Sequence, residues 1–457
     1  MADRSELTMD DAGETSQFAG ALPPADQGKK ANLVLLGCCV LQLPVWGTPS
    51  GCFPVSYGVL QENYTSSAAA DLQGDLNSTG IIGTTLNGII YLSMPLFFGL
   101  FTNRYAHLRR HATVLGMMLS VSSLLSSSWS TQVWQLILSQ GVIQAFGSAL
   151  IYTSSTIFLD EWFLRRKGFA YGVMLSVKSG VGASLPFLFG YLLSTTGFRT
   201  TLRIWAGVTF VAAVPAVFLL RPRIEVDREA RRTRALSWQF LTHPSFYFHQ
   251  VGNIIFSASY GMPQTYVPSF AAGVFHLSTS KSAFLVAALN APSILANIWF
   301  GLLSDGKPLW RGRWSMSIST VTLVSASGSC VSSLVFWGLA SPHSRAGLAL
   351  LGLFSVVYGF FAGGNSSTWA GIVKELSREA ESFNEPVDTA LIYGLLNGGR
   401  GIGWVVGGFI GVELLKEGAL DDSRWAYGTK YGCLILATGT GALFGGTSAL
   451  LKVRHLA

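Results

Sequence analysis

The sequence is poor in charged residues. Only 12% of its 457 residues are Asp, Glu, Lys or Arg, whereas 49% are hydrophobic and 51 are glycine. A soluble globular domain carries roughly 25% charged residues. The composition therefore excludes an ordinary soluble protein. It indicates a chain that crosses a membrane many times, with little length left for a soluble domain.

Cysteine and histidine are scarce as well. The cysteines show no metal-ligand spacing, and we expect free thiols that pack like small hydrophobic side chains. No His, Asp or Glu is expected at the centre of an apolar segment, so the acids, bases and metal ligands that a membrane enzyme needs are missing. We therefore predict that the protein is not an enzyme and uses no metal and no cofactor. The cysteines are Cys38, Cys39, Cys52, Cys330 and Cys433.

Residues 1–30 lack an apolar core and are rich in Asp and Glu. This composition excludes a cleavable signal peptide, so we expect the first apolar segment to direct insertion itself. We predict a disordered cytoplasmic tail over these residues.

Twelve apolar segments follow, and each is long enough for a membrane-spanning helix, which needs about 20 residues. We predict an all-α membrane protein with two pseudo-symmetric halves of six helices, residues 31–220 and 246–451. A cytoplasmic linker, 221–245, would join them, and a short tail, 452–457, would end the chain. The predicted spans are 31–58, 79–101, 111–129, 132–158, 168–193, 200–220, 246–271, 281–303, 314–340, 345–367, 388–413 and 425–451.

The formal net charge of +7 does not require a nucleic-acid partner. Most of the 31 Lys and Arg residues fall in loops on the same side as both termini, as expected for the cytoplasmic side of a membrane protein. Asn63 and Asn77 each begin an Asn-x-Thr glycosylation pattern in the first loop on the opposite side. We expect a monomeric, glycosylated, multi-pass protein of the plasma membrane, in contact with the lipid bilayer.

Two similar stretches lie more than two hundred residues apart. One runs from Tyr171 to Lys178 and the other from Tyr393 to Arg400, and each places a cation six residues after a glycine inside an apolar run. A charge near the bilayer centre costs roughly 2.5–3.5 kcal/mol and needs a partner or a water-filled cavity. The sequence has no acidic residue at the depth in the membrane that we expect for these two cations. We therefore predict that both cations bind a small organic anion. The alternative is that backbone carbonyl groups between helices satisfy them.

Other polar side chains could contribute to such a site. Asn397 shares a helix face with Arg400, and Asn290 and Asn297 share the eighth segment. Each amide is equally suited to an interhelical hydrogen bond. The first and seventh segments contain glycine and proline, which is typical of bent helices that line a cavity. The predicted substrate-binding residues are Lys178, Arg400, Asn397, Asn290, Asn297, Tyr260 and Tyr152.

Several short motifs occur in a fixed order along the chain. They include residues 56–61 at the end of the first segment, 165–168 before the fifth, 301–305 in the eighth and 398–403 in the eleventh. In this order they resemble the fungal monocarboxylate-porter type of the major facilitator superfamily. The resemblance implies the two-half fold described above. It also implies transport of a monocarboxylate or another small metabolite together with a proton.

The sequence departs from this family at two places. Asn103 stands before Arg104 where the superfamily signature Gly-x3-Asp-Arg has its acid, and we assign gating to these two residues and Asp305. Asn297 stands where the family has a cation, and Lys178 where it has a small or polar residue, so we hypothesise that the substrate cation changed helices. No residue is well placed to carry a coupling proton, and facilitated transport or exchange remains open.

We therefore predict a secondary transporter that moves a small organic anion, a monocarboxylate or a carboxylated metabolite, by alternating access. The alternative is an exporter of a fungal secondary metabolite, because relatives of this type often stand beside biosynthetic genes. A sensor without transport activity would need longer signalling tails than this chain has.

Overall fold

The structure is a computed structural model that describes residues 23–47, 73, 81–224, 236–306, 316–341, 343–417 and 424–448. Within these stretches the protein is helical, and the one β-type contact is an isolated bridge between Gln73 and Gln132. The main helices are α2 (Lys29–Val40), α3 (Gln42–Trp46), α5 (Ile81–Thr102), α6 (Arg109–Ser128), α7 (Val133–Leu136), α8 (Gln144–Trp162), α9 (Lys167–Leu219), α11 (Pro244–Phe275), α12 (Thr279–Ser304), α13 (Ile318–Val331), α14 (Arg345–Gly363), α15 (Trp369–Ser382), α16 (Thr389–Glu417) and α17 (Gly432–Phe444).

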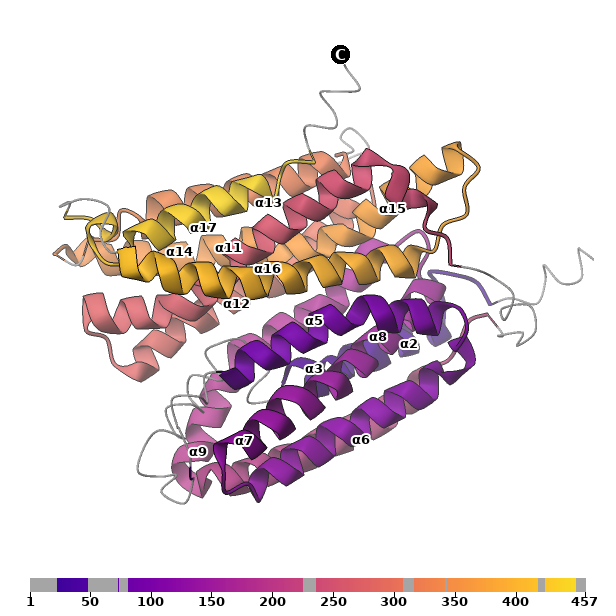
Figure 1. Cartoon of the computed structure of the whole chain (residues 1–457), viewed down its shortest axis with the longest axis horizontal. Coiled ribbons are helices and arrows are strands. Elements are labelled where there is room, and N and C mark those ends of the chain that lie inside the picture. The colour runs from indigo at the N-terminus through magenta and orange to yellow at the C-terminus, as the bar shows by residue number, and fades with distance from the viewer. Residues whose placement is uncertain are drawn as a thin grey trace, which may run out of the picture.

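The helices form two groups that lie side by side (Figure 1). Helices α2 to α9 make up the N-terminal group, and helices α11 to α17 make up the C-terminal group. The closest contacts between the groups are α9 with α12 and α5 with α16. These four helices therefore form the interface between the groups.

Glycine permits both of these close contacts. A Cβ atom at Gly172 of α9 would lie 2.4 Å from the backbone oxygen of Asn297 on α12. One at Gly394 of α16 would lie 2.8 Å from the Cβ of Phe98 on α5. Both glycines directly follow the tyrosine of the repeated stretch in the sequence. The two copies of the repeat therefore occupy the interface, one in each group.

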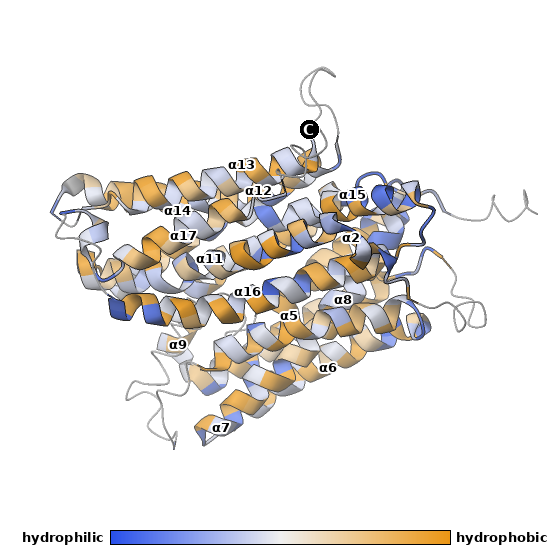
Figure 2. Ribbon diagram, turned by 45° about the horizontal axis from the view of Figure 1, so that its top comes forward, coloured by the Kyte–Doolittle hydropathy of each residue, from blue (hydrophilic) through white to orange (hydrophobic). Residues whose placement is uncertain are grey.

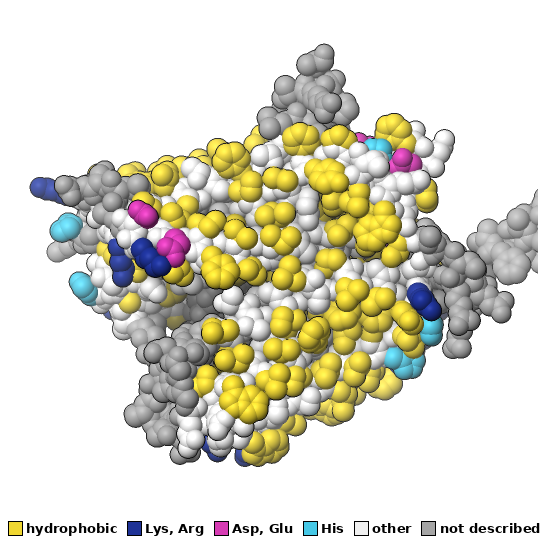
Figure 3. Space-filling view, viewed as in Figure 1, with side chains coloured by type: hydrophobic (Ala, Val, Ile, Leu, Met, Phe, Trp, Pro, Cys, Tyr) yellow, Lys and Arg dark blue, Asp and Glu magenta, His cyan; other side chains and the backbone are white. Residues whose placement is uncertain are grey.

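Apolar side chains cover much of the outer surface. Figure 2 shows hydrophobic residues along α6 and α16, and Figure 3 shows them over most of one face. Phe409 and Val211 are 73% and 72% exposed, which is unfavourable in water but not in lipid. Within the described residues, six helical stretches are long and apolar enough to cross a membrane: Ile81–Thr102, Val133–Trp162, Lys167–Leu219, Lys281–Ser304, Ile318–Trp337 and Ala346–Ser382.

Helices lie in the described part of every predicted segment, but the described part of the last one, 425–451, contains a single α-helix, α17, with 13 residues, followed by turn residues. Six described stretches qualify as spans, so the number twelve stays a prediction, and two further details differ. The fifth and sixth segments are both contained in α9, which turns between them at Gly197, where φ is +74° and ψ is 166°. Glycine adopts this conformation without steric cost. Helix α11, expected to be interrupted, runs continuously from Pro244 to Phe275 although Pro263 lies inside it.

Several predictions concern residues outside the described part of the chain. They include the glycosylation sites Asn63 and Asn77, the thiol of Cys52, most of the tail 1–30, about half of the linker and the C-terminal tail 452–457. The other four cysteines are free, as predicted.

The variant Gly172→Ala tests the contact between α9 and α12. Its new methyl group would meet the backbone of α12 at 2.4 Å, and overpacking of this kind typically costs about 1–3 kcal/mol. We expect a lower midpoint of thermal unfolding for the purified protein. Gly190→Ala in the same helix is the matched control, because a Cβ atom there meets nothing within 4 Å. Equal midpoints in the two variants would contradict the tight contact.

Candidate functional site

The guanidinium group of Arg400 lies among aromatic rings in the centre of the interface. Its Cζ is 5.2 Å from the ring centroid of Tyr260, 5.4 Å from that of Trp369 and 5.7 Å from that of Tyr91. Nη1 donates a hydrogen bond to Ser366. Nε is buried and has no hydrogen-bond partner among the described residues. Cation–π contacts contribute about 0.5–2 kcal/mol each, so the rings offset part of the cost of burying this charge.

Lys178 reaches the same place from the N-terminal group. Its Nζ lies 3.7 Å from the ring centroid of Trp46 and donates a hydrogen bond of 3.0 Å to Oη of Tyr91. Tyr91 therefore contacts both predicted cations, one through its hydroxyl and one through its ring. No carboxylate among the described residues forms an ion pair with Arg400.

The tyrosines of the two repeated stretches also meet. The ring centroids of Tyr171 and Tyr393 are 4.8 Å apart. Tyr393 further contacts the rings of Trp369 at 5.7 Å and Phe98 at 5.9 Å, and its Oη lies 3.3 Å from Oη of Tyr152. These five side chains form a layer that we call the tyrosine layer, and it joins the N-terminal and C-terminal groups.

The tyrosine layer lies on one side of the cations. Tyr171 and Tyr393 precede the two cations by seven residues, which is about 10 Å along a helix. They lie one turn from Lys167 and Thr389, the first residues of α9 and α16. We call the end of the molecule that contains these two first residues the inner end. The layer therefore separates the cations from the inner end.

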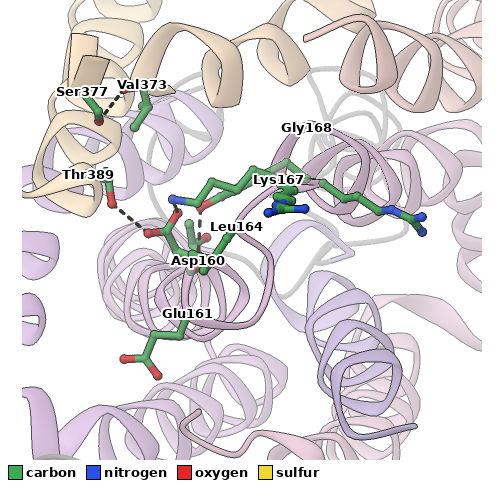
Figure 4. Close-up of polar contacts among 12 residues, drawn as sticks. Asp160, Glu161, Leu164, Lys167, Gly168, Val373, Ser377 and Thr389 are labelled. Carbon is green, nitrogen blue, oxygen red and sulfur yellow. Dashed lines mark hydrogen bonds and ion pairs between the residues drawn. The ribbon is translucent and has the colours of Figure 1, made fainter. Parts of the chain in front are cut away.

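A polar contact joins the groups at the inner end itself (Figure 4). Asp160 lies near the end of α8, and its Oδ1 is 2.5 Å from Nζ of Lys167. Its Oδ2 accepts a hydrogen bond of 2.8 Å from the hydroxyl of Thr389 on α16. One carboxylate thus connects α8, α9 and α16.

Asp305 makes a second connection between the groups. It follows α12, and its carboxylate accepts hydrogen bonds from the backbone nitrogens of Gly168 at 2.6 Å and Phe169 at 3.0 Å. These nitrogens belong to the first turn of α9, whose N–H groups have no partner within the helix. A negative charge at this position also interacts favourably with the helix dipole.

The other two predicted gating residues lie nearby. Asn103 lines a pocket of about 190 Å³ at the inner end, together with Asp160 and Glu161. Glu161 forms an ion pair with Arg109, which lines the same pocket. Arg104 is exposed, and its guanidinium carbon lies 5.7 Å from the ring centroid of the neighbouring Tyr105. Acidic residues therefore surround Asn103, which stands at the position of the acid in the family signature.

The three asparagines have different partners. Asn397 and Asn290 each donate to a backbone carbonyl one turn back in their own helix, at 2.9 Å and 3.0 Å. Asn297 donates to Ser179 of α9 at 3.0 Å and accepts from Ser367 at 2.7 Å. Its hydrogen bonds therefore correspond to the interhelical alternative stated for these amides.

The sequence analysis missed most of the rings around the cations. Trp46 and Tyr91 lie inside predicted apolar segments, where an aromatic residue gives no sign of facing inward. Trp369 follows the tenth predicted segment and begins α15. No pattern in the sequence distinguishes these three from the other aromatic residues, which make up 12% of the chain.

Comparison with known proteins identifies a family and several relatives. Residues 55–408 match the model of the Major Facilitator Superfamily. The chain is 27% identical to the fujikurins efflux protein of Gibberella fujikuroi, over 78% of this chain and 72% of that protein. It is 24% identical to the MFS-type transporter pynF of Aspergillus niger, over 88% of this chain and 85% of that protein. It is 28% identical to monocarboxylate transporter 10 of Mus musculus, over 47% of this chain and 41% of that protein.

The chain belongs to the Major Facilitator Superfamily, because the family model covers well over half of its length. This is a family of membrane transporters rather than of enzymes. The protein is therefore an integral, multi-pass membrane transporter with relatives among fungal efflux transporters.

The variant Asp305→Asn tests the contact between α12 and the start of α9. The substitution keeps the size of the side chain but removes the charge at the helix N-terminus, and we expect a loss of about 1–2 kcal/mol of stability. The measurement is the midpoint of thermal unfolding of the purified protein. Glu413→Gln is the control, because the pair of Glu413 with Lys416 is exposed and such pairs contribute little. If Asp305→Asn unfolds no earlier than this control, the carboxylate does not stabilise the contact.

Proposed function

We propose that the protein transports an organic anion and that Arg400 and Lys178 bind it. The observation that carries the proposal is the position of Arg400, which is 5% exposed and has no described carboxylate as ion-pair partner. A buried charge is costly unless it is paired. An anionic substrate would supply the missing charge and would accept a hydrogen bond from the buried Nε.

We propose alternating access as the mechanism, with twelve membrane-spanning helices in two pseudo-symmetric halves, residues 31–220 and 246–451, joined by the linker 221–245. The equivalent positions of the repeated glycines, tyrosines and cations at the interface support this symmetry. In transporters built from two such repeats, substrate binds at the interface and the halves move about it. We place the monomeric protein in the plasma membrane with both termini in the cytoplasm.

In this mechanism the inner end must open to release or admit substrate. The tyrosine layer and the contacts of Asp160 and Asp305 then form the closed inner gate, with Asn103 and Arg104 beside it. Each of these contacts joins the N-terminal and C-terminal groups or borders the pocket at that end. The contacts that join the two groups, such as Tyr171 with Tyr393 and Asp305 with Gly168, would have to break together when the inner end opens.

We propose export as the direction of transport. The relative named a fujikurins efflux protein matches 78% of this chain, whereas the monocarboxylate transporter matches 47%. The cargo would then be an anionic secondary metabolite. Uptake of a monocarboxylate is the second candidate, and the partial similarity to the mouse transporter favours it.

The variants Lys178→Gln and Arg400→Gln test the proposed binding residues. Both keep a polar side chain but remove the charge, so we expect loss of transport of anions without loss of folded protein. The assay is uptake of a panel of labelled organic anions and neutral compounds into proteoliposomes, with and without a pH gradient. Lys416→Gln is the control, since Lys416 is exposed and far along α16. Undiminished anion transport by Lys178→Gln and Arg400→Gln would refute the proposal.

Deletion of the gene in its host distinguishes the two directions. An exporter carries its cargo outward, so we expect an anionic metabolite to accumulate in the cells of the deletion strain, measured by mass spectrometry of cell extracts and medium. Loss of growth on a carboxylate carbon source, without such accumulation, would instead indicate uptake. Re-expression of the intact gene is the control for both outcomes.

A further inference from the structure

Four side chains of the C-terminal group face one another beside the cation site. Arg400 and Trp404 are one turn apart on α16, and Tyr260 and Gln264 are one turn apart on α11. The two helices approach closely, because a Cβ atom at Gly407 would lie 2.3 Å from a backbone oxygen of α11. Residues one turn apart share a helix face, so the two pairs meet across this contact.

Tyr260 lies at the centre of the four side chains. Its ring centroid is 5.2 Å from the guanidinium carbon of Arg400 and 6.3 Å from the ring of Trp404, which meets it edge-on at 75°. Its hydroxyl lies 3.5 Å from the amide nitrogen of Gln264. Tyr260 and Gln264 are 6% and 2% exposed. The cluster is therefore enclosed.

Three polar atoms in this cluster have no partner. Nε of Arg400, Nε1 of Trp404 and Oε1 of Gln264 are buried and form no hydrogen bond with the described residues. With the amide nitrogen on the Tyr260 hydroxyl, Oε1 is the free end of Gln264 and requires a donor, whereas the reversed amide would present a donor there. More than about 90% of buried polar groups in proteins are paired. These three atoms belong to side chains that contact or neighbour one ring, and a bound ligand or water would give each of them a partner.

We propose that Gln264 and Trp404 form a neutral subsite beside Arg400, and that the transported anion also carries an uncharged group that donates a hydrogen bond, such as a hydroxyl. This inference rests on the proposed function. Arg400 and Trp404 offer donors, whereas the amide of Gln264 offers an acceptor. A simple aliphatic carboxylate provides acceptors alone and leaves Gln264 unpaired. A hydroxylated anion satisfies all three atoms.

Water fits the same atoms between transport cycles. A hydroxyl group reproduces the hydrogen bonds of the water that it displaces, whereas an apolar group or an ether does not. A buried group that loses its partner is unfavourable, so the site selects against substrates without the donor. The subsite therefore discriminates between anions with and without a donor group, while Arg400 binds the negative charge that all of them share.

The first test separates a substrate-binding role from a structural one. Gln264→Leu removes an amide whose Oε1 has no described partner and whose nitrogen makes a long contact of 3.5 Å with the Tyr260 hydroxyl, so little stabilising interaction is lost. We expect a nearly unchanged midpoint of thermal unfolding and at least tenfold slower transport of a hydroxylated anion. Trp404→Phe, which removes the indole N–H, should slow this transport as well, whereas its midpoint also reports the lost packing of the larger ring on Tyr260. A clearly lower midpoint in Gln264→Leu, or undiminished transport of the hydroxylated anion by both variants, would overturn the proposal.

The second test uses matched probes on the purified full chain in lipid nanodiscs. We expect 4-hydroxybenzoate to bind at least about tenfold more tightly than 4-methoxybenzoate, because only the hydroxyl donates a hydrogen bond. Gln264→Leu should bind both probes alike. A preference that survives in Gln264→Leu, or no binding of 4-hydroxybenzoate to the unmodified protein, would overturn the subsite.

Arg400→Gln keeps the two proposals apart in this assay. Loss of both probes in this variant, together with an unchanged preference in Gln264→Leu, would refute the subsite and leave anion transport standing. Undiminished binding of both probes to Arg400→Gln would refute the anion site itself.

Discussion

The burial of positive charge between two groups of helices is the constraint on which this structure depends. Arg400 and Lys178 come from different groups, and both contact aromatic rings. Ring faces attract a cation without neutralising it. Tyr91 contacts both cations and therefore links the two groups at this point. The proposed anion would supply the negative charge that the rings do not.

The contacts around the cations also explain how the groups fit together. Glycine at the two repeat positions brings α9 against α12 and α16 against α5, and the preceding tyrosines then stack on each other. The same residues therefore set both the distance between the groups and the closure of the inner end. Residues of both groups belong to one hydrophobic core, so opening of the inner end in the proposed mechanism would separate packed apolar side chains as well as ring contacts and polar bonds.

The proposed site combines recognition of charge by Arg400 with recognition of hydrogen-bonding groups beside it. In the proposed site, the charge of the guanidinium group would select an anion, and Oε1 of Gln264 and Nε1 of Trp404, which have no partner among the described residues, would select among anions. A cation alone would accept many carboxylates, because its attraction is not directional over a large distance. Hydrogen bonds in an enclosed site are directional, and they reject a ligand that leaves them unmade. Members of one transporter family can therefore differ in cargo through a few neutral residues while keeping the same helices.

The sequence by itself determined the membrane class, most of the helices and the two deep cations, because apolar length, charge and a repeated spacing are local properties of the chain. It also placed Asp305 among the residues of interest, although not its partners in α9. The tertiary structure alone decided which rings cover the cations, that Asn297 bonds between helices, and that Tyr171 stacks on Tyr393. Most of these contacts join different helices, often far apart in the sequence, and the helix faces that meet depend on packing between groups. For the same reason no spacing in the sequence could show that Oε1 of Gln264 and Nε1 of Trp404 have no partner among the described residues, since an unpaired atom is defined by everything that surrounds it.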